Sequence, residues 1–207
     1  MTAAKARKEI ESGLLALGGD PSLAYLALTS KLELPVRDRI AWHFQEKSSE
    51  LIAAREYYLR SEESPNCRKR VDLALLDHRS LRPVVLVEFK SMIVPDPLTN
   101  RDHNLMVSLA DDLKGVAALT CAQRFGVMLM VHIENIQRLV QRGLDGRVVK
   151  YMEQFRRWAE YHEALQRAAE ITAEFFRGSG LKVRKLTIEL KPVWDTSVKL
   201  TAFILEP

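Results

Sequence analysis

The stretch that decides the fold of this chain covers residues 71–90 and reads VDLALLDHRSLRPVVLVEFK. Two short apolar runs, residues 71–77 and 84–89, flank a polar segment, a pattern typical of an antiparallel β-hairpin with a loop longer than two residues. Three charged side chains interrupt the two strands or directly follow them: Asp72, Glu88 and Lys90. Charges in such places are costly unless they are paired or bind a metal ion. The hairpin is therefore predicted to carry a chemical site.

The expected register of this hairpin brings the two carboxylates together. If the turn centres on Ser80, Asp72 lies directly opposite Glu88, with Cβ atoms about 5 Å apart on one face. Lys90 follows Glu88 by two residues and shares that face. The other face is expected to be core and consists of apolar side chains: Val71, Leu73, Leu75, Val85, Val87 and Phe89. Adjacent carboxylates repel, so we expect a cation between them, and oxygen ligands suit Mg²⁺ or Mn²⁺.

Together, these three side chains suit the hydrolysis of a phosphodiester. A divalent ion held by Asp72 and Glu88 would lower the pKa of bound water and neutralise charge developing on a phosphoryl group. Lys90 would orient the water and stabilise the transition state. The structural alternative is an ion pair in which Lys90 bridges the carboxylates at a sheet edge.

The rest of the chain predicts a mixed α/β (α+β) domain. Segments with helical periodicity, proline starts or glycine stops are residues 3–17, 21–32, 35–49, 104–120, 135–142 and 148–176. Strands are expected over residues 51–59, 71–77, 84–89, 125–133, 182–190 and 198–205. Residues 91–103 contain two prolines and are expected to be irregular.

Val71-Asp72 followed by Glu88-Phe89-Lys90 resembles the PD-(D/E)xK, or restriction-endonuclease-like, nuclease superfamily, with valine standing where the pattern has proline. The expected order of elements over residues 35–134 is similar to the αβββαβ core of that superfamily. A length of 207 residues favours one domain. Residues 1–34 would then be an N-terminal helical addition, and residues 135–207 a C-terminal helix–strand addition.

The resemblance implies a Mg²⁺-dependent nuclease in which Asp72 and Glu88 bind the metal and Lys90 is catalytic. It also implies the Phe89 carbonyl as a third ligand. Members of the superfamily often add a glutamate from the helix before the first strand, and here the candidates are Glu46, which we prefer, and Glu50. Four basic residues near the predicted site are expected to contact the phosphate backbone: Arg68, Lys69, Arg70 and Lys114.

The amino-acid composition excludes two classes of protein. With 47% hydrophobic and 28% charged residues, the chain is neither disordered nor membrane-embedded by composition. Its charged N-terminus lacks the apolar region of a secretory signal, and two cysteines fit a reducing compartment, so a cytoplasmic location is expected. A net charge of +4 permits a polyanionic partner. We expect DNA, with RNA as the alternative. A degenerate nuclease fold that only binds nucleic acid or a protein is the rival class.

A helix over residues 148–176 would be about 43 Å long at 1.5 Å per residue. It would carry an apolar, aromatic-rich stripe that includes Tyr151, Phe155, Trp158, Tyr161 and Phe175. One small domain rarely covers such a length. A homodimer formed through this helix is therefore the alternative to intramolecular core.

Overall fold

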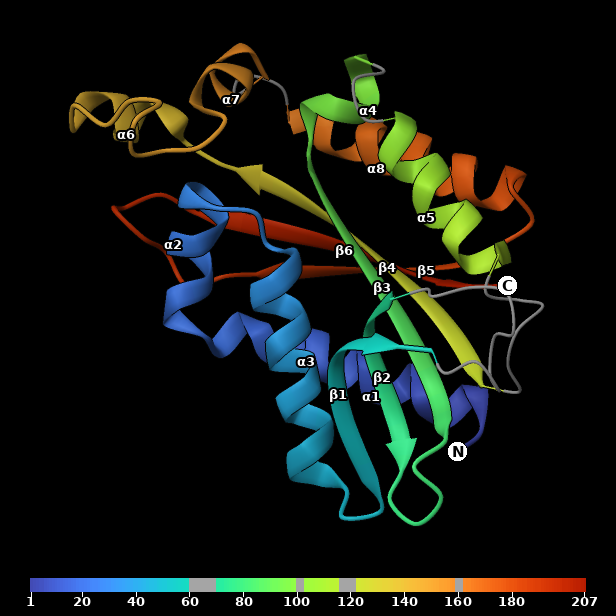
Figure 1. The fold of residues 1–207 in the computed structure, drawn as a ribbon. Helices are drawn as coiled ribbons and strands as arrows, with labels where there is room; N and C mark the ends of the chain where they lie inside the picture. Colours follow the sequence, from blue (N-terminus) through green and yellow to red (C-terminus); the bar gives the residue numbers. More distant parts are fainter. Residues whose placement is uncertain (60–69, 100–102, 116–121, 159–161) are drawn as a thin grey trace.

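The computed structural model describes residues 1–59, 70–99, 103–115, 122–158 and 162–207. Six strands form one mixed sheet in the order β1-β2-β3-β4-β6-β5. Helices cover both of its faces (Figure 1). Among the described helices, none is long and apolar enough to cross a membrane.

The first three strands form an antiparallel unit at one end of the sheet. They are β1 (Leu51–Tyr58), β2 (Arg70–Asp77) and β3 (Pro83–Ile93). Leu73 pairs with Val87 and Leu75 with Val85, which confirms the register expected for a turn centred on Ser80. The register shifts only nearer the turn, between Leu75 and Leu76.

The chain then crosses over to a parallel strand. Helices α4 (Pro95–Thr99) and α5 (His103–Gly115) lead to β4 (Gln123–Ile133), which runs parallel to β3. Strand β6 (Val198–Glu206) pairs antiparallel with β4, and β5 (Lys182–Glu189) forms the far edge. The order helix, three antiparallel strands, helix, parallel strand is therefore present between α3 and β4, with α4 as an extra short helix.

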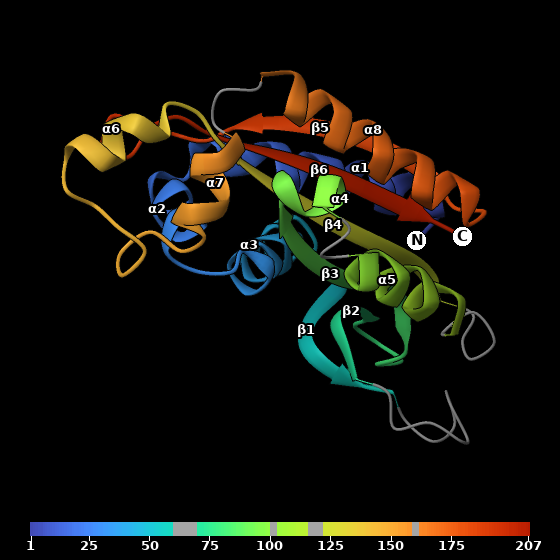
Figure 2. The same cartoon turned by 90° about the horizontal axis from the view of Figure 1, so that it is seen from above.

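Two main apolar layers hold helices against the sheet. One layer joins it to α1 (Ala3–Ala16), the 3-10 turn η1 (Leu17–Gly19), α2 (Pro21–Thr29) and α3 (Glu33–Lys47). The other layer joins it to α5 and α8 (His162–Gly178). Figure 2 shows α5 and α8 following β3, β4 and β6 along their length. Helices α6 (Ile136–Gln141) and α7 (Met152–Trp158) lie at the end where β4 finishes.

The single helix predicted over residues 148–176 is wrong. The structure has two helices there, α7 and α8, joined through residues 159–161, which lie outside the described part of the chain. Met152 and Phe155 of α7 pack in the layer of α1–α3, whereas Ala168 and Phe176 of α8 pack in the layer of α5. The described part of the apolar stripe thus serves two core layers within one chain, and the argument for a homodimer from one long helix loses its premise.

Residues 91–99 are also more regular than expected for the predicted irregular segment 91–103. Strand β3 continues to Ile93, and α4 begins at Pro95, because a proline is tolerated in the first turn of a helix. Asp96 is 8% exposed, and its carboxylate accepts a hydrogen bond of 2.8 Å from the Ile93 N–H. This bond ties α4 back to the end of β3.

Candidate metal centre at a strand fork

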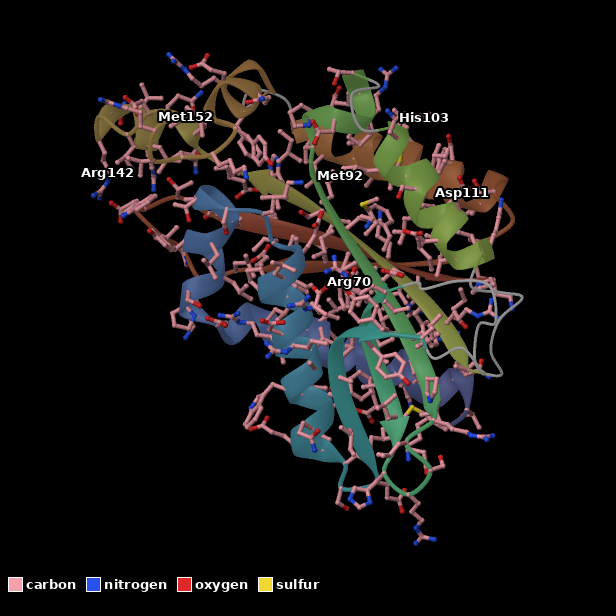
Figure 3. All side chains as sticks on the ribbon, in the orientation of Figure 1. Arg70, Met92, His103, Asp111, Arg142 and Met152 are labelled. Carbon is pink, nitrogen blue, oxygen red and sulfur yellow. The ribbon has the colours of Figure 1, made fainter. Side chains whose placement is uncertain are left out.

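Strands β2 and β3 separate beside Asp72. The last described pair of their ladder on this side is Leu73–Val87. Beyond it, Oδ2 of Asp72 accepts a hydrogen bond of 2.8 Å from the Phe89 N–H. A side chain thus replaces the strand partner that β3 would otherwise have. We call this point, from Asp72 to Phe89, the fork. In Figure 3, Arg70 marks the start of β2, and Met92 marks the part of β3 that continues past the fork.

Strand β2 changes faces at the fork, which the sequence pattern did not predict. Leu73 packs in the layer of α1–α3, whereas Val71 packs in a third small cluster with Leu86 on the other side. Residues two apart in a regular strand share a face, so Asp72 lies at an irregularity. Across from it in β1, Glu56 has a φ of 54°, in the left-handed region that non-glycine residues rarely adopt. The Asp72 side chain consequently reaches the edge of β3.

The Phe89 carbonyl belongs to the same edge. In an antiparallel ladder, the N–H and C=O of one residue point toward the same neighbouring strand. Because the Phe89 N–H is bound by Asp72, the Phe89 carbonyl oxygen also faces the fork. A carboxylate and a backbone carbonyl therefore converge there, as oxygen ligands for Mg²⁺ must.

Glu88 and Lys90 lie on the α5 side of β3. Strand alternation sets them apart from Val87 and Phe89, which pack in the layer of α1–α3. Glu88 is 7% exposed and Lys90 is half-buried. Glu88 pairs across the parallel ladder with Gly126. Glu88 directly precedes Phe89, whose N–H binds Asp72. Asp72 and Glu88 therefore lie at the same position along β3.

A small cavity beside Glu88 is also lined by Asp112 of α5 and Arg124 of β4. Burial lowers the pKa of the Arg124 guanidinium. The Arg124 Nη1 donates to the carbonyl of Leu113 at 3.5 Å. Asp112 lines the same small cavity as Glu88, whereas Lys114 is exposed on α5. Arg124 was missed by sequence reasoning, although its even spacing from Gly126 and Met128 would have placed it on this face.

The prediction that Glu46 or Glu50 approaches Asp72 is wrong. Both lie where α3 ends and β1 begins: the Gln45 side chain accepts from the Ala53 N–H at 3.2 Å, and the Glu50 carbonyl accepts from the His78 N–H at 2.9 Å. That end of the sheet is the turn end of the hairpin, because Leu51 pairs with Asp77. Along β2, the rise from Asp77 to Asp72 is about 16 Å.

Glu33, at the opposite end of the same helix, lies beside the fork. Its Oε1 accepts a hydrogen bond of 2.9 Å from the Ser91 N–H. Sequence reasoning missed Glu33 because the helix was expected to start at Pro35, two residues too late. In the structure, α3 runs back along β1, so the first turn of the helix lies near the end of β1 and the start of β2.

Three amides on one edge of β3, from every second residue, are thus bound by carboxylates. The N–H groups of Phe89, Ser91 and Ile93 point to the side that β2 has left, and their acceptors are Asp72, Glu33 and Asp96. We call residues 89–93 the open edge of β3. An unpaired buried amide is costly, so these carboxylates stabilise the strand even without a metal ion.

The predicted phosphate-binding residues are only partly placed. Arg68 and Lys69 lie outside the described residues. Arg70 is exposed at the start of β2, and its Nε lies 2.9 Å from Oε2 of Glu56. Glu56 also pairs with the buried Arg37. The fork therefore has positive side chains close by on the β1 side.

The Asp72 carboxylate and the Phe89 carbonyl are hard oxygen donors, and the nearby Glu88 carboxylate on the α5 side is a third, so the fork suits a magnesium-type ion better than a softer metal. Within the described ranges there is no group of three His, Cys, Asp or Glu side chains that could hold a metal ion. An ion here would therefore depend on the Phe89 carbonyl and on water, which Mg²⁺ retains readily.

No protein-family model, curated protein or solved structure matches this chain. A function for it consequently rests on the geometry of the fork and on the sequence resemblance.

Proposed function

We propose that this protein is a Mg²⁺-dependent phosphodiester hydrolase that acts on DNA. The observation that carries this proposal is the fork, where Asp72 and the Phe89 backbone meet beside Glu88 and Lys90. The order of α3, β1, β2, β3, α5 and β4 agrees with the core that the PD-(D/E)xK resemblance implies, and so supports it.

The proposed ligands are the carboxylates of Asp72 and Glu88 and the carbonyl oxygen of Phe89. When bound, the metal ion supplies a water molecule of lowered pKa and neutralises charge on the phosphoryl group. Lys90 has the role of orienting that water and of stabilising negative charge in the transition state.

Glu33 takes the place that the resemblance gives to a helix-borne glutamate. Glu33 binds the Ser91 N–H and Asp72 binds the Phe89 N–H, and these two amides are two residues apart, a strand rise of about 7 Å. Both carboxylates therefore lie on the open edge of β3, where the attacking water would bind. Glu33 is therefore proposed to orient the attacking water and to accept its proton.

Purified protein tests the proposal directly. With Mg²⁺ or Mn²⁺ it should nick plasmid DNA or cut a labelled duplex, and EDTA should abolish the activity. Asp72→Asn and Lys90→Met should each reduce the cleavage rate about 100-fold or more, because each removes a charge used in the transition state. Glu46→Gln removes a carboxylate at the far end of the sheet and should cut like the wild type.

The rival function is a non-catalytic module that binds nucleic acid or a protein. It is favoured by the hydrogen bonds of Asp72 and Glu33, which explain both carboxylates as structural. Calorimetry with Mn²⁺ separates the two. Metal binding that Asp72→Asn abolishes supports the hydrolase. If the protein binds no metal and cuts neither DNA nor RNA, the result supports the non-catalytic module.

A further inference from the structure

A cavity of about 300 Å³ lies at the far end of the open edge of β3. It is enclosed by the ends of β3 and β4 and by residues of α2, α4, α5 and α7, the region at the upper end of β3 in Figure 1. Ser91 lines it, and the N–H of this same serine binds Glu33. The cavity and the fork therefore lie on one continuous edge. From Phe89 to Ile93 that edge rises about 13 Å.

We propose that this cavity receives one nucleobase of the substrate, unstacked from its strand. This inference rests on the proposed function, because it takes nucleic acid as the substrate of the fork. Pockets for small ligands occupy roughly 300–1,000 Å³. The cavity lies at the lower limit of that range, so it accommodates a single nucleoside rather than two stacked ones.

The lining matches the parts of a nucleotide. Leu32, Ile93 and Val131 supply apolar wall for the faces of a base. Gln154 is half-buried in the wall, and an amide both donates and accepts hydrogen bonds, as the polar edge of a base requires. Lys31 is exposed and so lies at the mouth, where it can pair with a phosphate.

Tyr151 adds an aromatic ring to this wall. Proteins that bind unstacked bases commonly stack them on aromatic side chains. Tyr151 has a φ of 66°, a conformation that is rare for a bulky residue and that concentrates at binding sites. Its ring also lies 5.2 Å from the Lys150 ammonium nitrogen, which keeps positive charge beside it.

The experiment uses the full chain and duplexes in which 2-aminopurine replaces one base at a time. The edge length of about 13 Å corresponds to roughly four rises of 3.4 Å. The probe is therefore placed at each position within five nucleotides of the cut site, with Ca²⁺ replacing Mg²⁺ to hold back cleavage. One position should show a several-fold rise in fluorescence, since 2-aminopurine brightens when it leaves the stack. Equal, small changes at all positions would overturn the proposal.

Three variants sharpen this test. Gln154→Trp fills the cavity and should abolish the fluorescence rise, whereas Gln166→Trp, the same change at an exposed site on α8, should retain it. Gln154→Ala removes the amide without filling the cavity, and it tests the proposal if the tryptophan variant does not fold. It should raise KM about tenfold and change kcat little. A wild-type fluorescence rise in Gln154→Trp, or an unchanged KM in a folded Gln154→Ala, would exclude base entry.

Failure of the proposed function gives a different result. If the protein cuts neither DNA nor RNA, the cavity is tested alone with deoxynucleoside monophosphates by ligand-observed NMR. Line broadening that Gln154→Trp removes supports a base-binding cavity on a protein that is not a nuclease. No broadening with any of the four monophosphates overturns base binding and leaves the cavity to another small molecule.

Discussion

We propose that the Asp72 carboxylate both supports the edge of β3 and binds the metal ion. The substitutions Asp72→Asn and Asp72→Ala separate these two roles. Asp72→Asn keeps an oxygen that can accept the 2.8 Å hydrogen bond from the Phe89 N–H. We expect the free energy of unfolding to fall by less than about 1 kcal/mol, because only the extra strength of a charged acceptor is lost. Asp72→Ala leaves that amide without an acceptor in a buried strand. Its expected cost is about 2 kcal/mol, the usual range being roughly 1–3 kcal/mol for an unsatisfied buried group.

Urea denaturation monitored by circular dichroism measures both values. For a chain of this size, about 2 kcal/mol lowers the thermal midpoint by roughly 4–8 °C, so the alanine variant should be clearly resolved from the asparagine variant. Cleavage behaves differently, since the charge itself holds the metal ion. Both variants should lose activity about 100-fold or more, and Mn²⁺ should stabilise only the wild type.

Two outcomes would refute this reasoning. If the alanine variant is as stable as the wild type, the Asp72 side chain does not support the edge of β3. If the asparagine variant cuts DNA at the wild-type rate, Asp72 is a structural residue and the metal site is not at the fork.

Three further predictions concern other parts of the molecule. Gly126→Ala places a Cβ atom 2.9 Å from Cδ1 of the buried Leu113, so that side chain must move within the packed layer, and urea denaturation should show a loss of about 1–3 kcal/mol. Although burial opposes it, hydrogen bonding to Arg39 and to Ser22 lowers the pKa of Asp20 to about 2. The unfolded chain therefore binds the proton more tightly. The stabilisation by ionised Asp20, about 2 kcal/mol at neutral pH, should be lost as the pH falls from about 4 to about 2, and thermal midpoints of the wild type and Asp20→Ala should converge over that window. Glu33→Gln keeps an acceptor for the Ser91 N–H, so stability should change by less than about 1 kcal/mol while single-turnover cleavage slows at least tenfold; a normal cleavage rate would remove Glu33 from the proposed site.

The local sequence pattern was sufficient to predict the hairpin of β2 and β3. Alternation of apolar side chains and a polar turn placed Leu73 opposite Val87, because a strand repeats every two residues and a slip of one would turn every apolar side chain outward. The interruption of apolar strands by Asp72 and Glu88 was visible for the same reason. Phe89 was expected to be core and is 1% exposed. These features depend on neighbours in the chain, so the sequence by itself determined them.

Only the tertiary structure decided which end of α3 meets the fork and which layer each part of residues 148–176 enters. Periodicity shows that a helix has an apolar face, but it does not give the direction in which the helix crosses a sheet. Glu46 and Glu33 are both on α3, and only its path along β1 brings Glu33 to Ser91. The stripe from Tyr151 to Phe175 likewise reads as one helix, because a layer change between α7 and α8 leaves helical spacing on both sides intact. Long-range packing sets these positions, and a local pattern does not encode it.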